Sequence, residues 1–352
     1  MIRIGINGFG RIGKAILNQA LDNKNIRVNA INFPGFNIQK IESYINNDSF
    51  HKTNKRNVQI VSDNTINING NIIDFYDARI PDKNMWKDSD SKYVFETTGK
   101  FLTESTAKEH NVDYMIMCAP SKDSIVPQYL YNGNHLEYNG EKIVSNSSCT
   151  TNCIVPLIKI LNEKYGIEHC NFITVHAATA SQSVLDNPHL KKRNHRSVFN
   201  NIIPATTGAS KSAIKILPEL EGKIYGTSVR IPTGNVSMVD MNIKLSKKES
   251  LSNILEFLRG KDEIIVSDDE HLVSSDFCTT ENPTIVDSAA CLEMGDSNYK
   301  FTIWYDNEWS YSAQALKLLN HIHEINNAPI SRMDVLDIGL ARKKASMAML
   351  DA

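Results

Sequence analysis

The sequence predicts an α/β protein in two parts: a parallel-sheet domain up to about residue 148, followed by an α+β domain with a mixed sheet. The first observation is that expected strands and helices alternate along the first part, as they do where helices cover a parallel sheet. The second is that strands become longer and helices fewer beyond residue 148. The third is a glycine-rich turn that joins the first strand directly to the first helix, which is typical of doubly wound sheets.

The composition is that of an ordinary globular chain, with 352 residues, 41% hydrophobic residues and a formal net charge of -2. This length usually corresponds to two domains or one large one. The near-neutral charge gives no electrostatic reason to expect nucleic acid as a partner. No apolar run approaches the length of a membrane span, so we expect no membrane association.

The cysteines lack the spacing of a small secreted domain. The six positions are Cys118, Cys149, Cys153, Cys170, Cys278 and Cys291. The chain moves directly from Met1 into a strand, without a signal-peptide pattern. We therefore expect free thiols and a cytoplasmic location. We expect no metal site, because no CxxC partner cluster accompanies the central cysteines.

The first strand, residues 2–7, leads into Gly8-Phe9-Gly10-Arg11-Ile12-Gly13 and then a helical pattern to Leu21. This is G-x-G-x-x-G in its required context of strand, tight turn and helix. The glycines permit a close backbone approach, and the helix N-terminus can receive a pyrophosphate. The pattern predicts dinucleotide binding; the alternative is a plain βαβ turn.

The second strand, residues 26–32, is followed by Phe33 where an NAD-binding unit usually carries Asp or Glu for the ribose hydroxyls. Phe33 accepts no side-chain hydrogen bond, and no Arg stands beside it to hold a 2′-phosphate. The position therefore selects neither cofactor. Further along, Thr98, Gly99 and Cys118 follow buried strands, whose carboxyl ends face the ligand crevice in a parallel sheet. We expect these three residues at the cofactor site, although ordinary strand-end chemistry is the alternative.

The central stretch, residues 145–153 (SNSSCTTNC), predicts a strand end, a polar turn and a helix start. A thiol at a helix N-terminus loses its proton more easily, so Cys149 is expected to be a thiolate nucleophile. Core packing is the alternative for a cysteine pair four residues apart. His176 stands near the end of a later strand and Arg230 lies within another, with a long basic loop between them. A final helix is predicted over residues 310–325.

Six segments carry a family resemblance: INGFGRIG, SNSSCTTNC, TVHAATASQ, IIPATTGAS, VRIPTGNVS and WYDNEWSYS. Together they resemble phosphorylating glyceraldehyde-3-phosphate dehydrogenase over about residues 1–325. The resemblance implies a Rossmann domain (1–148) joined by the helix 310–325, and a catalytic domain (149–309) with a mixed, mostly antiparallel sheet. It also implies a homotetramer. Residues 326–352 extend past the expected end of the family and have no implied role.

The resemblance also implies site residues. Cys149 is the implied nucleophile and His176 its activator. Inorganic phosphate is implied at Ser148, Thr150, Thr207 and Gly208, and the substrate phosphate at Thr179 and Arg230. The implied cofactor residues are Gly8, Gly10, Arg11, Ile12, Phe33, Arg79, Thr98, Gly99, Cys118 and Asn307. The implied cofactor is NAD, with NADP as a second option.

The implied reaction converts glyceraldehyde 3-phosphate, inorganic phosphate and NAD to 1,3-bisphosphoglycerate through a Cys149 thiohemiacetal and thioester. One alternative is oxidation without phosphate, as in erythrose-4-phosphate dehydrogenase; Thr179 and the turn at 206–209 favour the phosphorylating enzyme. A thiol hydrolase is disfavoured by the glycine-rich turn and Asn307. A non-catalytic nucleotide- or RNA-binding homologue is disfavoured by the intact Cys149 and His176.

Two departures from the family pattern lie in the basic loop and the tail. Asn194, between Arg193 and Arg196, makes the loop unusual, so we do not assign Arg196 as a phosphate ligand, whereas Pro188 resembles NAD-using members. Residues 333–341, followed by three basic residues, predict a short amphipathic helix. It is interpreted as a surface helix or frayed tail, with partner docking as the alternative.

Overall fold

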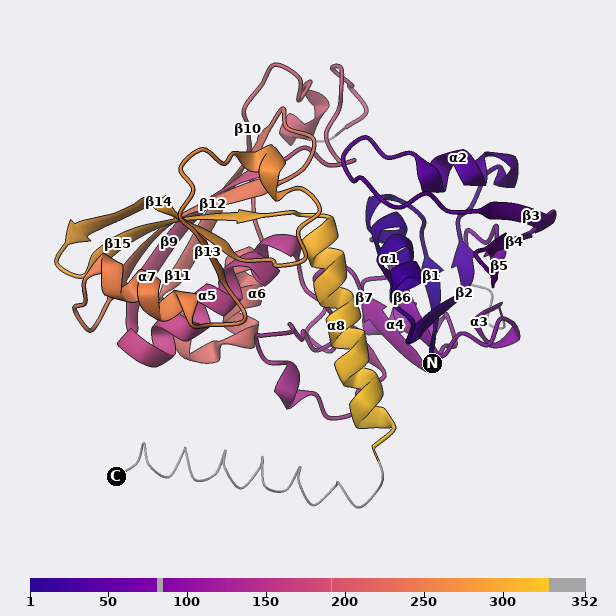
Figure 1. Ribbon diagram of the computed structural model, residues 1–352, viewed down its shortest axis with the longest axis horizontal. Coiled ribbons are helices and arrows are strands. Elements are labelled where there is room, and N and C mark those ends of the chain that lie inside the picture. Colours follow the sequence, from indigo (N-terminus) through magenta and orange to yellow (C-terminus); the bar gives the residue numbers. More distant parts are fainter. Residues whose placement is uncertain (81–84, 191, 329–352) are drawn as a thin grey trace.

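The computed structural model describes residues 1–80, 85–190 and 192–328. Its two sheets lie side by side, and the helix α8 runs between them (Figure 1). The first sheet is formed before Cys149 and the second after it, so the predicted α/β architecture is confirmed. The predicted amphipathic tail helix at 333–341 lies outside the described residues.

The first sheet has eight strands in the order β3-β4-β5-β2-β1-β6-β7-β8. They are β1 (Ile2–Asn7), β2 (Ile26–Asn32), β3 (Val58–Ser62), β4 (Thr65–Ile68), β5 (Asn71–Tyr76), β6 (Tyr93–Glu96), β7 (Tyr114–Met117) and β8 (Ile143–Ser145). The run from β5 to β8 is parallel, while β3 and β4 extend one edge as an antiparallel pair. The strand order reverses beside β1, so the ligand crevice of this sheet is expected at its carboxyl end.

Helices α1 (Arg11–Asp22), α2 (Ile41–Asn46), α3 (Met85–Asp88) and α4 (Glu104–Lys108) belong to this first part. Short 3₁₀ helices occur at η1 (Ile38–Lys40), η2 (His135–Glu137), η3 (Lys192–His195), η4 (Pro218–Leu220) and η5 (Ser274–Phe277).

The second sheet has seven strands in the order β10-β11-β9-β12-β15-β14-β13. They are β9 (Ile167–Ala177), β10 (Ile203–Ala205), β11 (Ile224–Ile231), β12 (Ser237–Leu245), β13 (Ile265–Ser267), β14 (Ile285–Gly295) and β15 (Asn298–Tyr305). The β9–β11 and β13–β14 pairs are parallel and the other four are antiparallel, as the resemblance implied.

Helices α5 (Cys149–Tyr165), α6 (Ala209–Ile216) and α7 (Leu251–Arg259) lie together below the strands of the second sheet in Figure 1. The apolar residues of these helices share one core with the alternating buried residues of β9, β12 and β15. This packing anchors α5, so the position of its first residue, Cys149, is fixed by the core beneath it.

Helix α8 (Trp309–Asn326) returns to the first part of the chain. Its Leu316, Leu319 and Ile322 are buried in the same core as Ile4 and Ile6 of β1. The helix matches the predicted range 310–325 to within one residue at each end. It starts where the Asp306 carboxylate accepts backbone N–H bonds from Glu308 and Trp309 at 2.9 and 2.8 Å.

Candidate active site

Cys149 is the first residue of α5, and its thiol faces a histidine from the second sheet. The Ser148 hydroxyl caps the helix by accepting the Thr151 backbone N–H at 3.1 Å. The Cys149 Sγ lies 3.4 Å from Nε2 of His176, the penultimate residue of β9. The predicted nucleophile and activator are therefore brought within contact distance, although 27 positions separate them in sequence.

The orientation of the His176 ring is set by its own backbone. Nδ1 lies 2.7 Å from the carbonyl oxygen of Ala177. The Ala177 carbonyl only accepts and so pairs with a proton on Nδ1, and this tautomer leaves an Nε2 lone pair for the thiol; Arg230 Nη1, which only donates, contacts the same Nδ1. The ring is buried and meets Tyr305 edge-on at 6.1 Å. This is the tautomer that a general base toward Cys149 requires.

Arg230 lies opposite His176 in the parallel register of β11 and β9. Its Nη1 contacts His176 Nδ1 and donates to the Ala177 carbonyl at 3.1 Å. The buried Nε of Arg230 has no hydrogen-bond partner within the described ranges. A guanidinium with an unused donor beside the thiol is suited to an anion.

Burial and nearby charges keep the His176 ring and the Cys149 thiol neutral in this structure. Burial, helped by the charge of Arg230, lowers the pKa of His176 to about 3. Burial also raises the pKa of the Cys149 thiol, and this outweighs the lowering by Arg230 and the Thr150 N–H. Desolvation of the sulfur therefore opposes the thiolate expected at this helix terminus, and the role of Cys149 as the nucleophile stays a prediction. The pair is arranged for proton transfer from sulfur to Nε2.

Of the predicted phosphate residues, Arg230 lines a pocket, and Thr207 and Thr179 are next to or bonded to residues that line it. A pocket of about 500 Å³ is lined by Arg230, Thr206 and three residues of the basic loop, Lys192, Arg193 and Asn194. Thr207 accepts the Ala209 N–H at 3.1 Å, and Gly208 caps α6 and is exposed. Exposed Thr179 bonds to Gln182, another pocket residue, at 2.9 Å.

Thr150 is buried, and its hydroxyl lies 2.9 Å from the Tyr305 hydroxyl, which in turn lies 2.9 Å from Thr174. In this structure the Thr150 side chain is therefore part of the core, and its role as a phosphate ligand stays a prediction. Arg196, which the sequence left unassigned, pairs with exposed Asp186 at 3.1 Å.

The glycine-rich turn has the shape that a dinucleotide needs. Gly8 has φ +96°, and a Cβ there would meet Thr98 at 2.8 Å. A Cβ on Gly10 would have no atom within 4 Å, and no side chain caps α1. The first N–H groups of α1 therefore face open space, which fits a pyrophosphate. Ile12 packs against the adjoining core.

The Arg11 side chain takes a different direction. It binds Asp48 through two hydrogen bonds of 2.7 and 3.0 Å and also binds Glu308. These acids hold the pKa of Arg11 above its usual value, against the effect of burial. Arg11 therefore joins the first part of the chain to the start of α8, and only its backbone is left for a cofactor.

Phe33 belongs to an aromatic cluster. Its ring lies 5.1 Å from Phe36 and 6.0 Å from Phe9, and it stacks on Tyr44 at 6.3 Å. An acid nevertheless stands nearby: Asp77, just beyond β5, accepts the Gly35 N–H at 2.7 Å in the turn that carries Phe33. No local sequence pattern marks Asp77, because the pairing of β2 with β5 brings it to this turn.

A second missed group is buried beneath the crevice. Glu96 accepts hydrogen bonds from the Asn7 side chain and the Thr98 backbone, and Asn7 accepts one from Asn32 at 2.7 Å. This network ties the carboxyl ends of three strands together. Gly99 follows it with φ +70°, and the Cys118 backbone N–H donates to Glu96 O at 2.9 Å.

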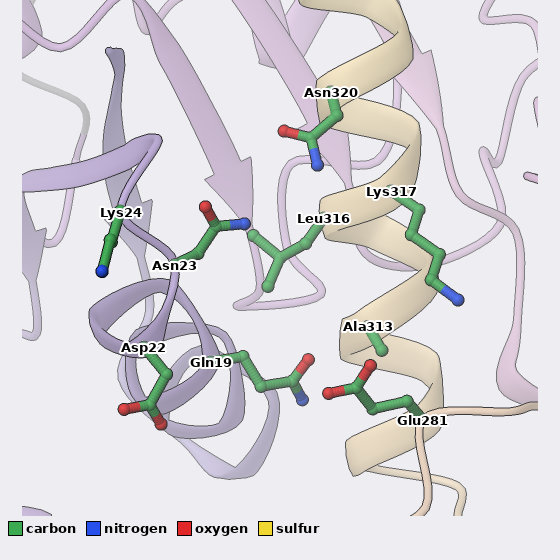
Figure 2. A pocket seen from close by; sticks show the side chains of 9 residues that line it. All are labelled: Gln19, Asp22, Asn23, Lys24, Glu281, Ala313, Leu316, Lys317 and Asn320. Carbon is green, nitrogen blue, oxygen red and sulfur yellow. The ribbon is translucent and has the colours of Figure 1, made fainter.

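Asn307 follows Asp306 and is buried. Its Oδ1 accepts a 2.9 Å bond from the Ser237 hydroxyl, which itself accepts the Ala177 N–H at 3.0 Å. Asn307 is therefore linked by two hydrogen bonds to the residue that orients His176. Arg79 is exposed just beyond β5. A separate pocket of about 440 Å³ lies away from this site between α1 and α8, where Gln19 and Glu281 approach each other (Figure 2).

Two family models match the chain. "Glyceraldehyde 3-phosphate dehydrogenase, NAD binding domain" matches residues 2–104, and "Glyceraldehyde 3-phosphate dehydrogenase, C-terminal domain" matches residues 148–307. No helix in the described parts is long and apolar enough to cross a membrane.

Curated relatives match over nearly their full length. The chain is 38% identical to glyceraldehyde-3-phosphate dehydrogenase of Podospora anserina, over 91% of this chain and 97% of that one. It is 39% identical to glyceraldehyde-3-phosphate dehydrogenase 1 of Schizosaccharomyces pombe, over 90% and 96%. It is also 39% identical to the enzyme of that name from Bacteroides fragilis, over 90% and 98%. With both domain models and these relatives in agreement, the chain belongs to the glyceraldehyde-3-phosphate dehydrogenase family.

Proposed function

We propose that this protein is a phosphorylating glyceraldehyde-3-phosphate dehydrogenase of glycolysis and gluconeogenesis. It oxidises glyceraldehyde 3-phosphate to 1,3-bisphosphoglycerate with NAD and inorganic phosphate. The observation that carries the proposal is the 3.4 Å contact of Cys149 Sγ with His176 Nε2, next to the Arg230 guanidinium.

The first chemical step is attack by sulfur. His176 Nε2 takes the thiol proton as Cys149 Sγ bonds to the aldehyde carbon. The imidazolium then returns this proton to the carbonyl oxygen, which becomes the thiohemiacetal hydroxyl. The Cys149 backbone N–H, at the start of α5, is placed to stabilise negative charge on that oxygen. His176 then accepts the hydroxyl proton as hydride leaves carbon, which gives the thioester.

Inorganic phosphate then attacks the thioester carbon and the Cys149 thiolate leaves. Arg230 and Thr179 hold the substrate phosphate, while Ser148, Thr207 and Gly208 hold the attacking phosphate. This assignment is supported by the cationic pocket around Arg230, because charged N–H donors and hydroxyls are what phosphate oxygens require.

NAD, when bound, supplies the hydride acceptor. The open Gly10 turn and the uncapped N-terminus of α1 fit its pyrophosphate, and Asn307 is the proposed partner of the nicotinamide amide. Gly8, Thr98, Gly99 and Cys118 are proposed to form the surrounding crevice, with Phe33 and Arg79 toward the adenosine. NADP is proposed as an alternative because Phe33 provides no carboxylate that would select NAD. It is the weaker alternative because no Arg stands beside Phe33 to hold a 2′-phosphate.

We also propose the domain division 1–148 and 149–309, with 310–325 returning to the first domain, and a homotetrameric assembly. The two sheets support the division. Apolar side chains exposed on the loop between β9 and β10 support the assembly: Val184, Leu185, Phe199 and Ile202 are 62–76% exposed in the single chain. All six cysteines are free, which supports a cytoplasmic location.

The decisive experiment is a steady-state assay with glyceraldehyde 3-phosphate, with and without inorganic phosphate, comparing NAD and NADP. We expect phosphate-dependent reduction that is faster with NAD. Turnover independent of phosphate would reject the phosphorylating assignment in favour of a thioester-hydrolysing enzyme. A Cys149→Ser variant that kept dehydrogenase activity would reject the mechanism, with Cys291→Ser as the matched control.

A further inference from the structure

A group of three potential metal ligands lies at the junction of the two sheets. His51 follows α2, Cys278 follows η5, and Asp306 precedes α8. One ligand atom from each of them lies within 4.8 Å of the others. Among the described residues this is the one group of three His, Cys, Asp or Glu side chains with atoms so close. The chemistry derived above uses none of the three.

We propose that His51, Cys278 and Asp306 bind a divalent zinc-like cation, with the amide oxygen of Asn235 as the fourth ligand. One nitrogen, one thiolate and two oxygens are a ligand set that zinc accepts, and four such ligands complete a tetrahedral site. Zinc bonds of about 2.0–2.3 Å require the ligand atoms to close in slightly around the ion. Cys278 is the partly exposed member, so its side chain has room for that adjustment.

Asn235 is the independent observation that points to a cation. Its Nδ2 lies 3.0 Å from His51 Nε2, 3.0 Å from Asp306 Oδ2 and 3.5 Å from Cys278 Sγ. The amide NH2 group of Asn235, which carries partial positive charge, thus faces all three ligand atoms, as a cation would. The Asn235 side chain is more than nine-tenths buried, and its Oδ1 has no partner in the described chain. Rotation of the amide by half a turn places that oxygen among the ligands.

The charged side chains around this group favour a cation and orient the His51 ring. Three carboxylates (Asp48, Asp306 and Glu308) outnumber the two cations paired with them, Arg11 and Lys14. On the other side of the ring, Arg11 Nη2 lies 3.3 Å from His51 Nδ1, and carboxylate oxygens of Asp48 and Glu308 lie 3.7 and 3.8 Å from it. These side chains fix the ring so that Nε2 faces Asp306, Asn235 and the proposed ion.

The backbone at the group is held in unusual conformations. Val236 and Thr279, which adjoin Asn235 and Cys278, have φ of +66° and +71°. Both are β-branched, so this left-handed backbone is strained, and strain of this kind concentrates at functional sites. The Thr279 N–H donates to Asp306 Oδ2 at 2.8 Å, which fixes Cys278 over the carboxylate. A bound ion would join the two parts of the chain next to Asn307.

The test uses the full chain with Cys149→Ser, which removes the catalytic thiol as a competing zinc ligand. Zinc is titrated against a chromophoric chelator, and the metal retained after gel filtration is measured by atomic emission. We expect one zinc per chain and release of the Cys278 thiol proton on binding. Adding Cys278→Ala should weaken binding by about 100-fold or more, whereas adding Cys291→Ala should not change it.

Cobalt provides a second readout, because its spectrum reports directly whether a thiolate is bound to the metal. Cobalt bound in the Cys149→Ser chain should show the sulfur-to-metal charge-transfer band of a thiolate ligand, and this band should disappear with Cys278→Ala. No bound zinc in Cys149→Ser, or equal binding with and without Cys278, overturns the proposal. These measurements involve no turnover, so their failure is distinct from failure of the dehydrogenase assignment.

Discussion

Arg230 and His176 are register partners on neighbouring parallel strands, and the Arg230 guanidinium contacts Nδ1 of the His176 ring. Both side chains converge on one carbonyl, that of Ala177. The positive charge therefore lies beside the base without donating to the nitrogen that faces Cys149. The proposed ligand of the substrate phosphate and the proposed base are in this way one electrostatic unit.

Replacing Arg230 should change the pH profile as well as substrate binding. Burial and the Arg230 charge both lower the pKa of His176, so an Arg230→Leu variant should raise that pKa. Since the base acts in its neutral form, the acid limb of kcat/KM should move to higher pH. The KM for glyceraldehyde 3-phosphate should rise by roughly 10- to 100-fold, as a charge-assisted hydrogen bond is lost. Arg259→Leu on α7 is the control. If the acid limb of the kcat/KM profile did not move in Arg230→Leu, the coupling between Arg230 and His176 would be contradicted.

Ser237 is predicted to position Asn307. In Ser237→Ala the 2.9 Å bond to Asn307 Oδ1 is lost, and the Ala177 N–H loses its acceptor. Loss of a buried hydrogen bond of this kind corresponds to about 1 kcal/mol, so the KM for NAD should rise several-fold. Phosphate affinity should be unchanged. The control is Ser252→Ala, at an exposed position on α7. An equal KM for NAD in the two variants would refute the role of Ser237 in positioning Asn307.

The Arg11–Asp48 pair is predicted to stabilise the fold above acid pH. The side chains of Asp48 and Arg11 are 4% and 35% exposed, so Asp48→Asn should lower the free energy of unfolding by about 2 kcal/mol at pH 7. Burial alone would raise the Asp48 pKa, but the bonds from Arg11 and backbone N–H groups outweigh it and lower the pKa.

The contribution of Asp48 is therefore present above its unfolded pKa of about 4 and is lost as pH falls toward the folded value. Urea unfolding at pH 7 and at about pH 3 should show the difference between wild type and variant shrinking in acid. The exposed pair Arg3–Asp90 supplies the control, because Asp90→Asn should change stability by about 0.5 kcal/mol or less. An equal loss in both variants would exclude the proposed stabilisation.

Asp77 is predicted to act against NADP. Its carboxylate is held at the turn that carries Phe33, where it would repel a 2′-phosphate. Asp77→Asn keeps an oxygen for the Gly35 N–H but removes the charge. The ratio of kcat/KM for NADP to that for NAD should rise by about fivefold, for a repulsion of about 1 kcal/mol near the surface. Asp63→Asn, in the β3–β4 turn, should leave the ratio unchanged.

Local patterns in the sequence predicted the elements that carry their own signal. The strand, turn and helix around Gly8 and the start of α5 at Cys149 follow from glycine positions, polar caps and apolar spacing. The terminal helix and the mixed second sheet were also predicted correctly. Proximity across the sheets was beyond local patterns: Asp77 reaches the Phe33 turn through strand pairing, and Ser237 reaches Asn307 across 70 positions.

Two features of the candidate site depend on packing that local patterns do not show. The Thr150 hydroxyl is paired with Tyr305, since the first turn of α5 lies against β15. Burial raises the pKa of the Cys149 thiol, opposite to the shift that the helix terminus alone predicts. In both cases the residue type fits the predicted role, and tertiary burial changes the environment in which it acts.

The place of α8 in the first core has a consequence for how the chain is made. Leu316, Leu319 and Ile322 complete the packing around β1, yet they are synthesised after the whole second sheet. A nascent chain that has been synthesised as far as β8 still lacks α8, and the core of its first sheet is therefore incomplete. The domain that emerges first from the ribosome is thus the last to close, because its core is completed only when α8 has been synthesised.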